Sequence, residues 1–220
     1  MAVRSEEITS IFLKLVDADV EIVPSEDGTV HVDAEPGNAF TVKRDGAILE
    51  VLTSTSWKLR NLLEKEKERA KLTLRVPRDV KVGGGMKRAS LKARKILFDS
   101  LSIGEATAEL EECEVKSLAV APARVKGSLY VTEGTKVAVS MGSLELRVLE
   151  FEGDLDLSTV MGSIVLKLPE DCDAVIETVQ QGGEVVVNSG RLLGSGEHRI
   201  RISNVRGTVI VDLWGEGDEV

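Results

Sequence analysis

The chain is poor in aromatic residues, cysteine and histidine. Aromatic residues make up 3% of its 220 residues, although hydrophobic residues as a whole make up 42%. A core of Val, Leu, Ile and Ala suits stacked aliphatic ladders better than a globule centred on large rings. The two cysteines, Cys113 and Cys172, lack a CxxC spacing and companion histidines, so neither a zinc site nor a redox pair is predicted. We expect two buried free thiols, with one disulfide as the alternative.

Long apolar runs are also missing. Residues 1–7 contain no apolar stretch typical of a secretion signal, and no segment approaches the roughly 18 consecutive apolar residues of a membrane span. We therefore expect a cytoplasmic protein without a transmembrane segment. Two Gln and four Asn accompany 30% charged residues, a bias common in proteins from thermophiles, so a thermophilic source is a further expectation.

A short glycine-led motif recurs in the second half of the chain. Met141-Gly142-Ser143-Leu144-Glu145-Leu146 returns twenty positions later as Met161-Gly162-Ser163-Ile164-Val165-Leu166. Looser copies begin at Lys126, Gly183 and Arg206. Apolar residues alternate after each glycine, which indicates a strand with one buried face. Such short strands cannot bury that face alone, so the pattern predicts stacked rungs with glycine at the corners.

These repeats predict an all-β protein built as a single-stranded β-helix, or β-solenoid, of right-handed winding. The solenoid is expected over residues 72–220, with weaker rungs upstream of the clearest repeats. Residues 1–56 form strand-like runs separated by Asp27-Gly28, Pro36-Gly37 and Asp45-Gly46, which predicts an antiparallel β region capping the solenoid. Residues 57–71 are expected to be a helical or mobile connection. The one short helix is predicted near Asn61 to Ala70, because Asn61 and Glu64 have capping-box spacing.

The layout resembles that of a known family. Strand-like runs end in proline at Val20–Pro24, Lys71–Pro77 and Leu166–Pro169, and glycine-led aliphatic strands follow the second run. This arrangement is similar to the "putative adhesin" domains of unknown function in bacteria and archaea, and the likeness spans nearly the whole chain. The resemblance implies a β-helix and an adhesin-like protein, and it implies no catalytic residues.

Several segments invite a chemical interpretation and do not support one. Gly83-Gly84-Gly85-Met86-Lys87 lacks the spacing of a phosphate-binding loop, so we predict a corner between strands. His31 and His198 lie in separate strand-like segments, and Gly194–His198 lacks the nucleophile-elbow pattern. The acidic run of Glu109, Glu111, Glu112 and Glu114 lacks the spacing of a calcium loop and is expected to be a solvated face. We therefore predict no catalytic, cofactor-binding or metal-binding residues.

Positive charge is concentrated in one segment. Residues 58–95 carry fourteen Lys or Arg and four acidic residues, a net charge of +10, whereas the whole chain has a net charge of −9. This segment is a candidate patch for an anionic partner, either nucleic acid or an acidic membrane surface. The alternatives are charge-steered self-assembly, for instance with the acidic tail Glu216–Glu219, and neutralisation within one fold. The candidate patch residues are Lys58, Arg60, Arg75, Arg78, Lys81, Lys87, Arg88, Lys92, Arg94 and Lys95.

The function favoured by these patterns is a non-enzymatic scaffold that self-associates. A solenoid exposes strand edges at its ends, and pairing of such edges is a direct route to homo-oligomers. The alternative is a binding module for an anionic partner through the basic segment. A polysaccharide-acting enzyme is disfavoured because sugar-stacking aromatic residues are scarce.

Overall fold

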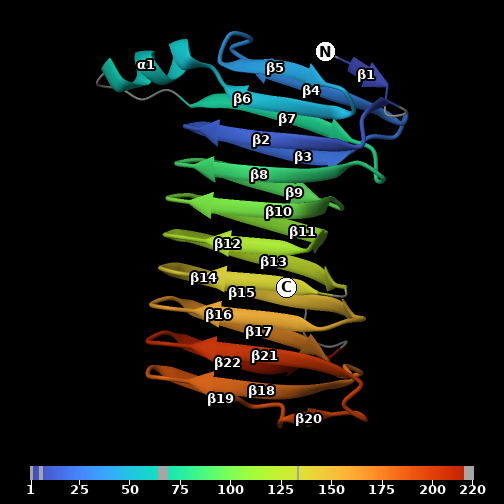
Figure 1. Cartoon of the computed structure of the whole chain (residues 1–220), viewed down its shortest axis with the longest axis vertical. Helices are drawn as coiled ribbons and strands as arrows, with labels where there is room; N and C mark the ends of the chain where they lie inside the picture. The colour runs from blue at the N-terminus through green and yellow to red at the C-terminus, as the bar shows by residue number, and fades with distance from the viewer. Residues whose placement is uncertain (1, 5–6, 64–68, 133, 216–220) are drawn as a thin grey trace.

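The chain forms two facing ladders of β-strands. The computed structural model describes residues 2–4, 7–63, 69–132 and 134–215, which contain 22 strands and one α-helix. The strands stack along one long axis, and the N-terminal and C-terminal strands lie towards opposite ends of it (Figure 1). The predicted all-β class with a single short helix is confirmed for this part of the chain.

One ladder, called ladder A, consists mostly of parallel strands. In spatial order its strands are β5 (Phe40–Asp45), β6 (Ile48–Thr53), β2 (Ser10–Val16), β8 (Lys81–Lys87), β10 (Leu97–Gly104), β12 (Ser117–Val120), β14 (Thr135–Val139), β16 (Leu155–Thr159), β21 (His198–Asn204), β18 (Ala174–Gln180) and β20 (Leu192–Leu193). Only the outermost pairings, β5 with β6 and β18 with β20, are antiparallel.

The opposite ladder, called ladder B, has a matching order. Its strands are β1 (Ala2–Arg4), β4 (Thr29–Glu35), β7 (Ala70–Val76), β3 (Ala18–Pro24), β9 (Ser90–Arg94), β11 (Thr107–Val115), β13 (Ala123–Val131), β15 (Gly142–Phe151), β17 (Ser163–Pro169), β22 (Thr208–Trp214) and β19 (Glu184–Val187). The start of β10 in ladder A also pairs with the end of β11 in ladder B. The two ladders therefore belong to one curled sheet.

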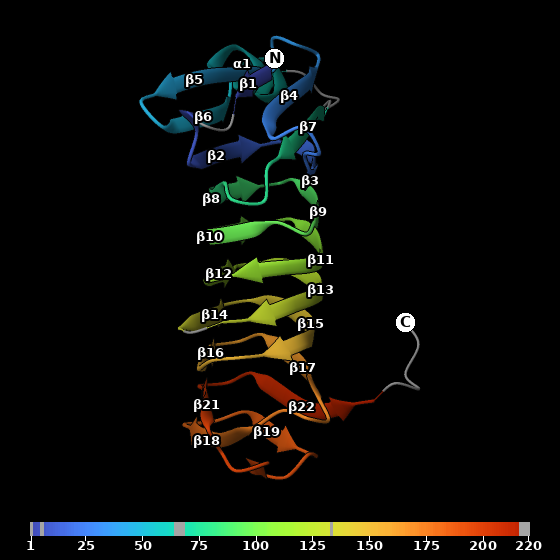
Figure 2. The ribbon, with the colours of Figure 1, turned by 90° about the vertical axis from the view of Figure 1, so that its right-hand side faces the viewer.

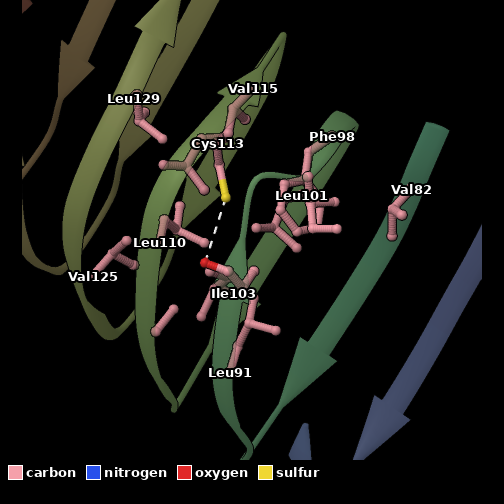
Figure 3. Packing of buried hydrophobic residues seen from close by; sticks show 14 of the residues in the cluster. Val82, Leu91, Phe98, Leu101, Ile103, Leu110, Cys113, Val115, Val125 and Leu129 are labelled. Atoms are coloured by element: carbon pink, nitrogen blue, oxygen red, sulfur yellow. Dashed lines mark hydrogen bonds between the residues drawn. The ribbon is translucent and has the colours of Figure 1, made fainter. Parts of the chain in front are cut away.

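Aliphatic side chains fill the space between the ladders. Alternate residues of each strand point inward, and partners in neighbouring strands stack in columns (Figure 3). Such a column in ladder A contains Leu101, Leu118, Val137, Leu157 and Ile202, all buried. Burying each such side chain contributes about 1.5–3 kcal/mol. The columns explain how a chain with few aromatic residues fills a core.

The repeated Met-Gly-Ser motifs lie at stacked corners. Ser143 pairs with Ser163, and Ser163 pairs with Thr208, so the glycines that precede them occupy equivalent corners between the ladders. A Cβ at Gly162 would lie 2.5 Å from the side chain of Val139, which explains the glycine there. The copy at Lys126 does not belong to this set, because Gly127 lies inside β13 opposite Leu146.

The glycine run at 83–85 lies within a strand rather than at the predicted corner. All three glycines belong to β8, between β2 and β10 in ladder A. Gly84 has a φ of +126°, and a Cβ there would lie 2.0 Å from the carbonyl oxygen of Leu13. The prediction of a corner was wrong, because the run continues a strand in which Gly84 has a φ that would turn a side chain into the backbone of β2.

The helix begins earlier than predicted. Helix α1 spans Thr55–Leu63, and the hydroxyl of Ser54 accepts a hydrogen bond from the backbone N–H of Trp57. Ser54 therefore caps the helix in place of Asn61, and Glu64 lies outside the described residues. The helix lies beside β5 and β6 at the N-terminal end of the ladders (Figure 1), where the Trp57 side chain is buried.

The N-terminal 56 residues divide between two locations. Strands β2 and β3 pair with β8 and β9 and so lie inside the ladders. The antiparallel strands β1, β4 and β5 lie beyond the parallel strands, towards the N-terminal end. The antiparallel region predicted for residues 1–56 is therefore found only in part, because β2, β3 and β6 pair in parallel within the ladders.

Candidate functional site

The basic residues of β9 face acidic residues one strand further along ladder B. Lys92 lies 3.7 Å from Glu109, Arg94 lies 3.3 Å from Glu111, and Lys95 lies 3.1 Å from Glu112, measured between the charged atoms. Each pair joins two neighbouring strands of ladder B, or the corners that follow them, on an exposed face. Three members of the acidic run predicted as a solvated face therefore pair with three members of the basic segment.

This alternation continues along the ladder as a row that we call the charge row. It consists of Lys92, Glu109, Lys126 and Glu145, on β9, β11, β13 and β15. Lys126 lies 2.8 Å from Glu109, and its hydrogen bond lowers the pKa of the Glu109 carboxyl. The next positions in the row are Val165, Ile210 and Val186, so the face becomes aliphatic towards the C-terminal end.

The other candidate patch residues are dispersed. Arg75 lies 3.5 Å from Asp33, and Lys87 lies 2.9 Å from Glu105. Arg88 makes two hydrogen bonds, of 2.8 and 3.0 Å, to the mostly buried carboxylate of Asp17. Lys58 and Arg60 lie on α1, whereas Arg78 and Lys81 lie at the entry to β8. The ten residues do not form one basic patch, because they occupy both ladders and the helix, and six of them pair with acidic side chains.

In the part of the chain that the structure describes, five non-glycine residues have left-handed backbone conformations. They are Asp17, Arg88, Lys95, Glu105 and Glu112, each with φ between +49° and +54°. Asp17, Arg88 and Glu105 follow β2, β8 and β10 at equivalent corners, and later corners have Pro122, Met141, Met161 and Arg206 at the same position in register. The glycine-led repeats in the sequence do not extend to these upstream corners, so the repeats do not predict them. The recurrence of charged residues every 17 positions, as in Arg88 and Glu105 or Lys95 and Glu112, is the signal that could have found them.

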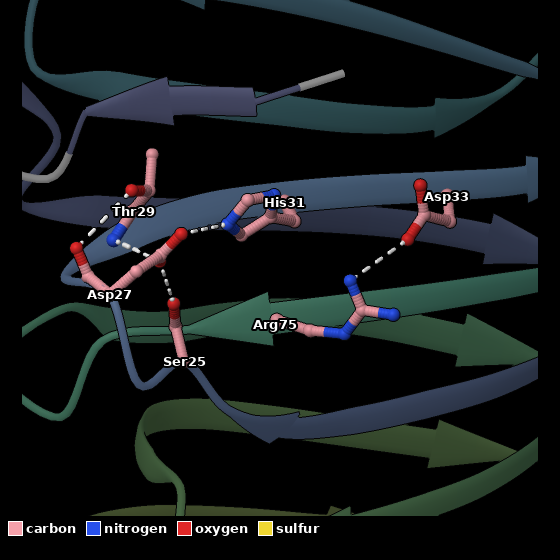
Figure 4. Close-up of polar contacts among 6 residues, drawn as sticks. All are labelled: Ser25, Asp27, Thr29, His31, Asp33 and Arg75. Atoms are coloured by element: carbon pink, nitrogen blue, oxygen red, sulfur yellow. Dashed lines mark hydrogen bonds and ion pairs between the residues drawn. The ribbon is translucent and has the colours of Figure 1, made fainter.

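The histidines lie in strands, as predicted. The Asp27 carboxylate contacts the His31 ring nitrogen at 2.8 Å and accepts a hydrogen bond from the Ser25 hydroxyl at 2.7 Å (Figure 4). The carboxylate stands between the other two groups, so it holds the β3–β4 turn and leaves serine and histidine without the contact that activates a nucleophile. These bonds lower the pKa of Asp27, with the Ser25 hydroxyl the main cause. His198, in β21, packs edge-on against Phe151, and the centroids of the two rings lie 5.9 Å apart.

An open groove of about 1360 Å³ lies over ladder B. Its floor includes Glu109, Lys126 and Glu145, and its side includes Leu213 and Trp214 at the end of β22. The Trp214 indole N–H donates a 2.9 Å hydrogen bond to the carbonyl of Val148, and the Arg147 guanidinium lies 3.5 Å from the ring centroid. The groove carries charges of both signs, which sets it apart from a nucleic-acid channel.

The two ends of the ladders differ in how they are covered. At the N-terminal end, β5, β4, β1 and α1 lie beyond the parallel strands (Figure 2). At the C-terminal end, β20 pairs with only the first two residues of β18. Among the described residues β19 pairs only with β22, so one side of β19 is an open edge. We call this edge, residues 184–187, the β19 edge.

The β19 edge combines free backbone groups with aliphatic side chains. The N–H groups of Glu184 and Asn188 bond to β22, so those of Val185 and Val187 point away from it by the alternation of a β-ladder. Val185, Val186 and Val187 are half-buried. Leu192 and Val179, which belong to the same end of the molecule, are each 64% exposed. The end therefore offers hydrogen bonds and apolar surface together.

Both cysteines are buried free thiols, as predicted. Burial raises the pKa of each to about 11, which keeps them in the unreactive protonated form. Within the described ranges, no cluster of three His, Cys, Asp or Glu side chains could hold a metal ion. Over the same residues, no helix has the length and apolar character needed to cross a membrane.

Comparison with solved structures identifies proteins of similar fold. A structure described as a "putative adhesin" from Bacteroides fragilis has 14% identity and a TM-score of 0.51, and the match covers 96% of this chain and 95% of that one. A "putative cell adhesion protein" from Clostridium sporogenes has 12% identity, a TM-score of 0.43 and 97% coverage of both chains. A "putative adhesin" from Parabacteroides distasonis has 12% identity, a TM-score of 0.44 and coverage of 96% and 95%.

No protein-family model matches the chain, and no curated protein matches it. At these identities the likeness concerns the fold alone. It rests on the Bacteroides fragilis structure, whose TM-score is 0.51. The all-β architecture is therefore shared with the Bacteroides fragilis protein over nearly its whole length.

Proposed function

We propose that this protein is a non-enzymatic, adhesin-like β-solenoid that acts as a scaffold and forms a dimer through the β19 edge. The two ladders are the walls of the solenoid, and each parallel strand of ladder A leads into a strand of ladder B, whereas the antiparallel strands β5 and β20 lead into another strand of ladder A. The observation that carries the proposal is the unequal covering of the two ends. An edge strand with free N–H groups and three consecutive valines is a template for another strand, unless a neighbour covers it.

The geometry of β19 favours a twofold symmetric contact. Two copies related by a twofold axis at Val186 would run antiparallel, with Val185 of one copy opposite Val187 of the other. Val165, Ile210 and Val186 would then continue as one aliphatic strip across the junction. Because β20 extends beyond β18, the two copies would meet at ladder B alone. The covered N-terminal end would remain free, so the assembly closes as a dimer instead of growing into a filament.

Light scattering or analytical ultracentrifugation across a dilution series tests this proposal. We expect a concentration-dependent dimer for the unmodified chain. Val185→Pro should yield a monomer with an unchanged circular dichroism spectrum, because proline removes only an outward-pointing N–H on an edge strand. Ile48→Lys is the matched control at the N-terminal end, and it should leave the dimer intact. A strict monomer at high concentration, or dissociation by the control alone, would overturn the proposal.

A further inference from the structure

The last rung in the sequence is not the last rung in space. A rung here means a ladder A strand together with the ladder B strand that follows it. At the C-terminal end, β21 lies between β16 and β18, and β22 lies between β17 and β19 (Figure 1). The chain thus builds the outermost rung, β18 and β19, first and then returns to insert β21 and β22 one position further in.

The N-terminal end has the same arrangement. Strand β2 lies between β6 and β8, and β3 lies between β7 and β9. The first rung of the chain is therefore also one position inside the end. Both inserted rungs have buried inner faces: Ile11, Leu13 and Ile22 at one end, and Ile200, Ile202 and Val209 at the other, are each at most 2% exposed.

Buried polar side chains gather at the corners of these two rungs. Asn204, at the end of β21, donates hydrogen bonds of 2.9 Å to the carbonyls of Glu184 and Gly207, and it accepts one of 2.8 Å from the N–H of Gly207. It thereby ties the inserted rung to the outer strand β19. At the other end, Thr53 of the outer strand β6 bonds both the N–H and the carbonyl of Val16 in β2.

We propose that this arrangement makes the chain a load-bearing element, because its first rung, β2 and β3, and its last rung, β21 and β22, are each held one position inside the ladders. In a solenoid whose rungs follow sequence order, the terminal strand is hydrogen-bonded to a neighbour on one side only. Tension on that strand peels it away and then exposes the next strand in the same way. Here load that enters through Ser10 or Trp214 reaches a strand bonded on both sides. The strand leaves only by breaking both sets of bonds, or by carrying the outer rung with it, and either route breaks more bonds at once than peeling.

Single-molecule force spectroscopy with two alternative attachment points tests this proposal. The shared anchor is Lys116→Cys, at an exposed corner between β11 and β12, in a chain whose native cysteines are changed to alanine. The second anchor is either Leu213→Cys, on the inserted strand β22, or Ser189→Cys, just after the outer strand β19. We expect the first rupture through Leu213 to need about twice the force needed through Ser189, because bonds on two sides replace bonds on one. Equal or reversed forces would overturn the proposal.

A substitution at the buried corner provides a second comparison. Asn204→Ala should bring the rupture force at the Leu213 anchor down towards that at the Ser189 anchor. Thr135→Val is the matched control, since Thr135 is also buried but its hydroxyl, among the described residues, bonds only the nearby Thr132 carbonyl. If the Asn204 variant does not fold, the comparison between anchors still decides the question. A control variant that lowers the force as much as Asn204→Ala would contradict the assigned role of the corner.

Discussion

Single residues decide how the chain turns between the two ladders. The corners after β2, β8 and β10 use charged residues with left-handed φ, Asp17, Arg88 and Glu105, whereas three later corners have a glycine one position further on. Such a conformation costs about 1 kcal/mol or more for a non-glycine residue. The ion pairs of Arg88 with Asp17 and of Lys87 with Glu105 join neighbouring corners of this kind and offset part of that cost. The early and later corners of the ladders therefore turn in different ways.

Gly84 is a position where one methyl group should matter. Gly84→Ala would place a Cβ 2.0 Å from the Leu13 carbonyl oxygen at a φ that disfavours L-residues, so β2 and β8 would have to separate. We expect a loss of about 3 kcal/mol or more in the free energy of unfolding, measured by denaturant titration. Gly37→Ala is the control, because nothing lies within 4 Å of its Cβ position, and its effect should stay within about 1 kcal/mol. Equal effects of the two changes would contradict the close approach.

At the scale of elements, charged rows help to set the register of ladder B. Lys92, Glu109 and Lys126 face one another because their strands are parallel and offset by 17 residues. Exposed pairs of this kind contribute only a few tenths of a kcal/mol to about 1 kcal/mol each. Their value lies in opposing a shifted register, which would place like charges side by side.

Reversing the middle charge should expose this effect. Glu109→Lys places three lysines in one row, and we expect it to lower the free energy of unfolding by about 1–2 kcal/mol at low salt, with a smaller loss at high salt. The inverted row changes every charged position in register, from Glu21 on β3 to Glu145 on β15. This variant, Glu21→Lys, Lys92→Glu, Glu109→Lys, Lys126→Glu and Glu145→Lys, keeps the alternation and should recover most of the loss. Thermal or denaturant unfolding at two salt concentrations measures both. An inverted row as unstable as the single variant would show that the charges do not interact.

The local sequence pattern does not predict where helix α1 begins. The capping-box spacing of Asn61 and Glu64 is a sequence signal, yet the helix begins at Thr55 with Ser54 as its cap. The deciding factor is the burial of Trp57 at the N-terminal end of the ladders. That contact depends on strands far away in the sequence, and a nine-residue helix gains more from such packing than from its own propensity.

At the scale of the whole molecule, the paired charges bear on the anionic-partner alternative. Because six of the ten candidate basic residues contact acidic side chains, we expect no retention on a heparin column at physiological ionic strength. Salt-dependent retention that is lost in a Lys92→Gln, Arg94→Gln, Lys95→Gln variant would instead support an anionic partner. Lys58→Gln with Lys81→Gln is the control away from the charge row. Cytoplasmic location and thermophilic origin stay predictions.

The sequence by itself determined the all-β class, the aliphatic core, the stacked Met-Gly-Ser corners and the buried thiols. These features are local, since a period of two and a glycine at a corner are visible within a few residues. Only the tertiary structure decided the inserted rungs, the charged corners and the open β19 edge. Asp17 and Arg88, for example, are 71 residues apart in the chain. Such pairings depend on the order in which rungs stack, and strands of similar hydrophobic pattern fit several positions equally well until their neighbours are in place.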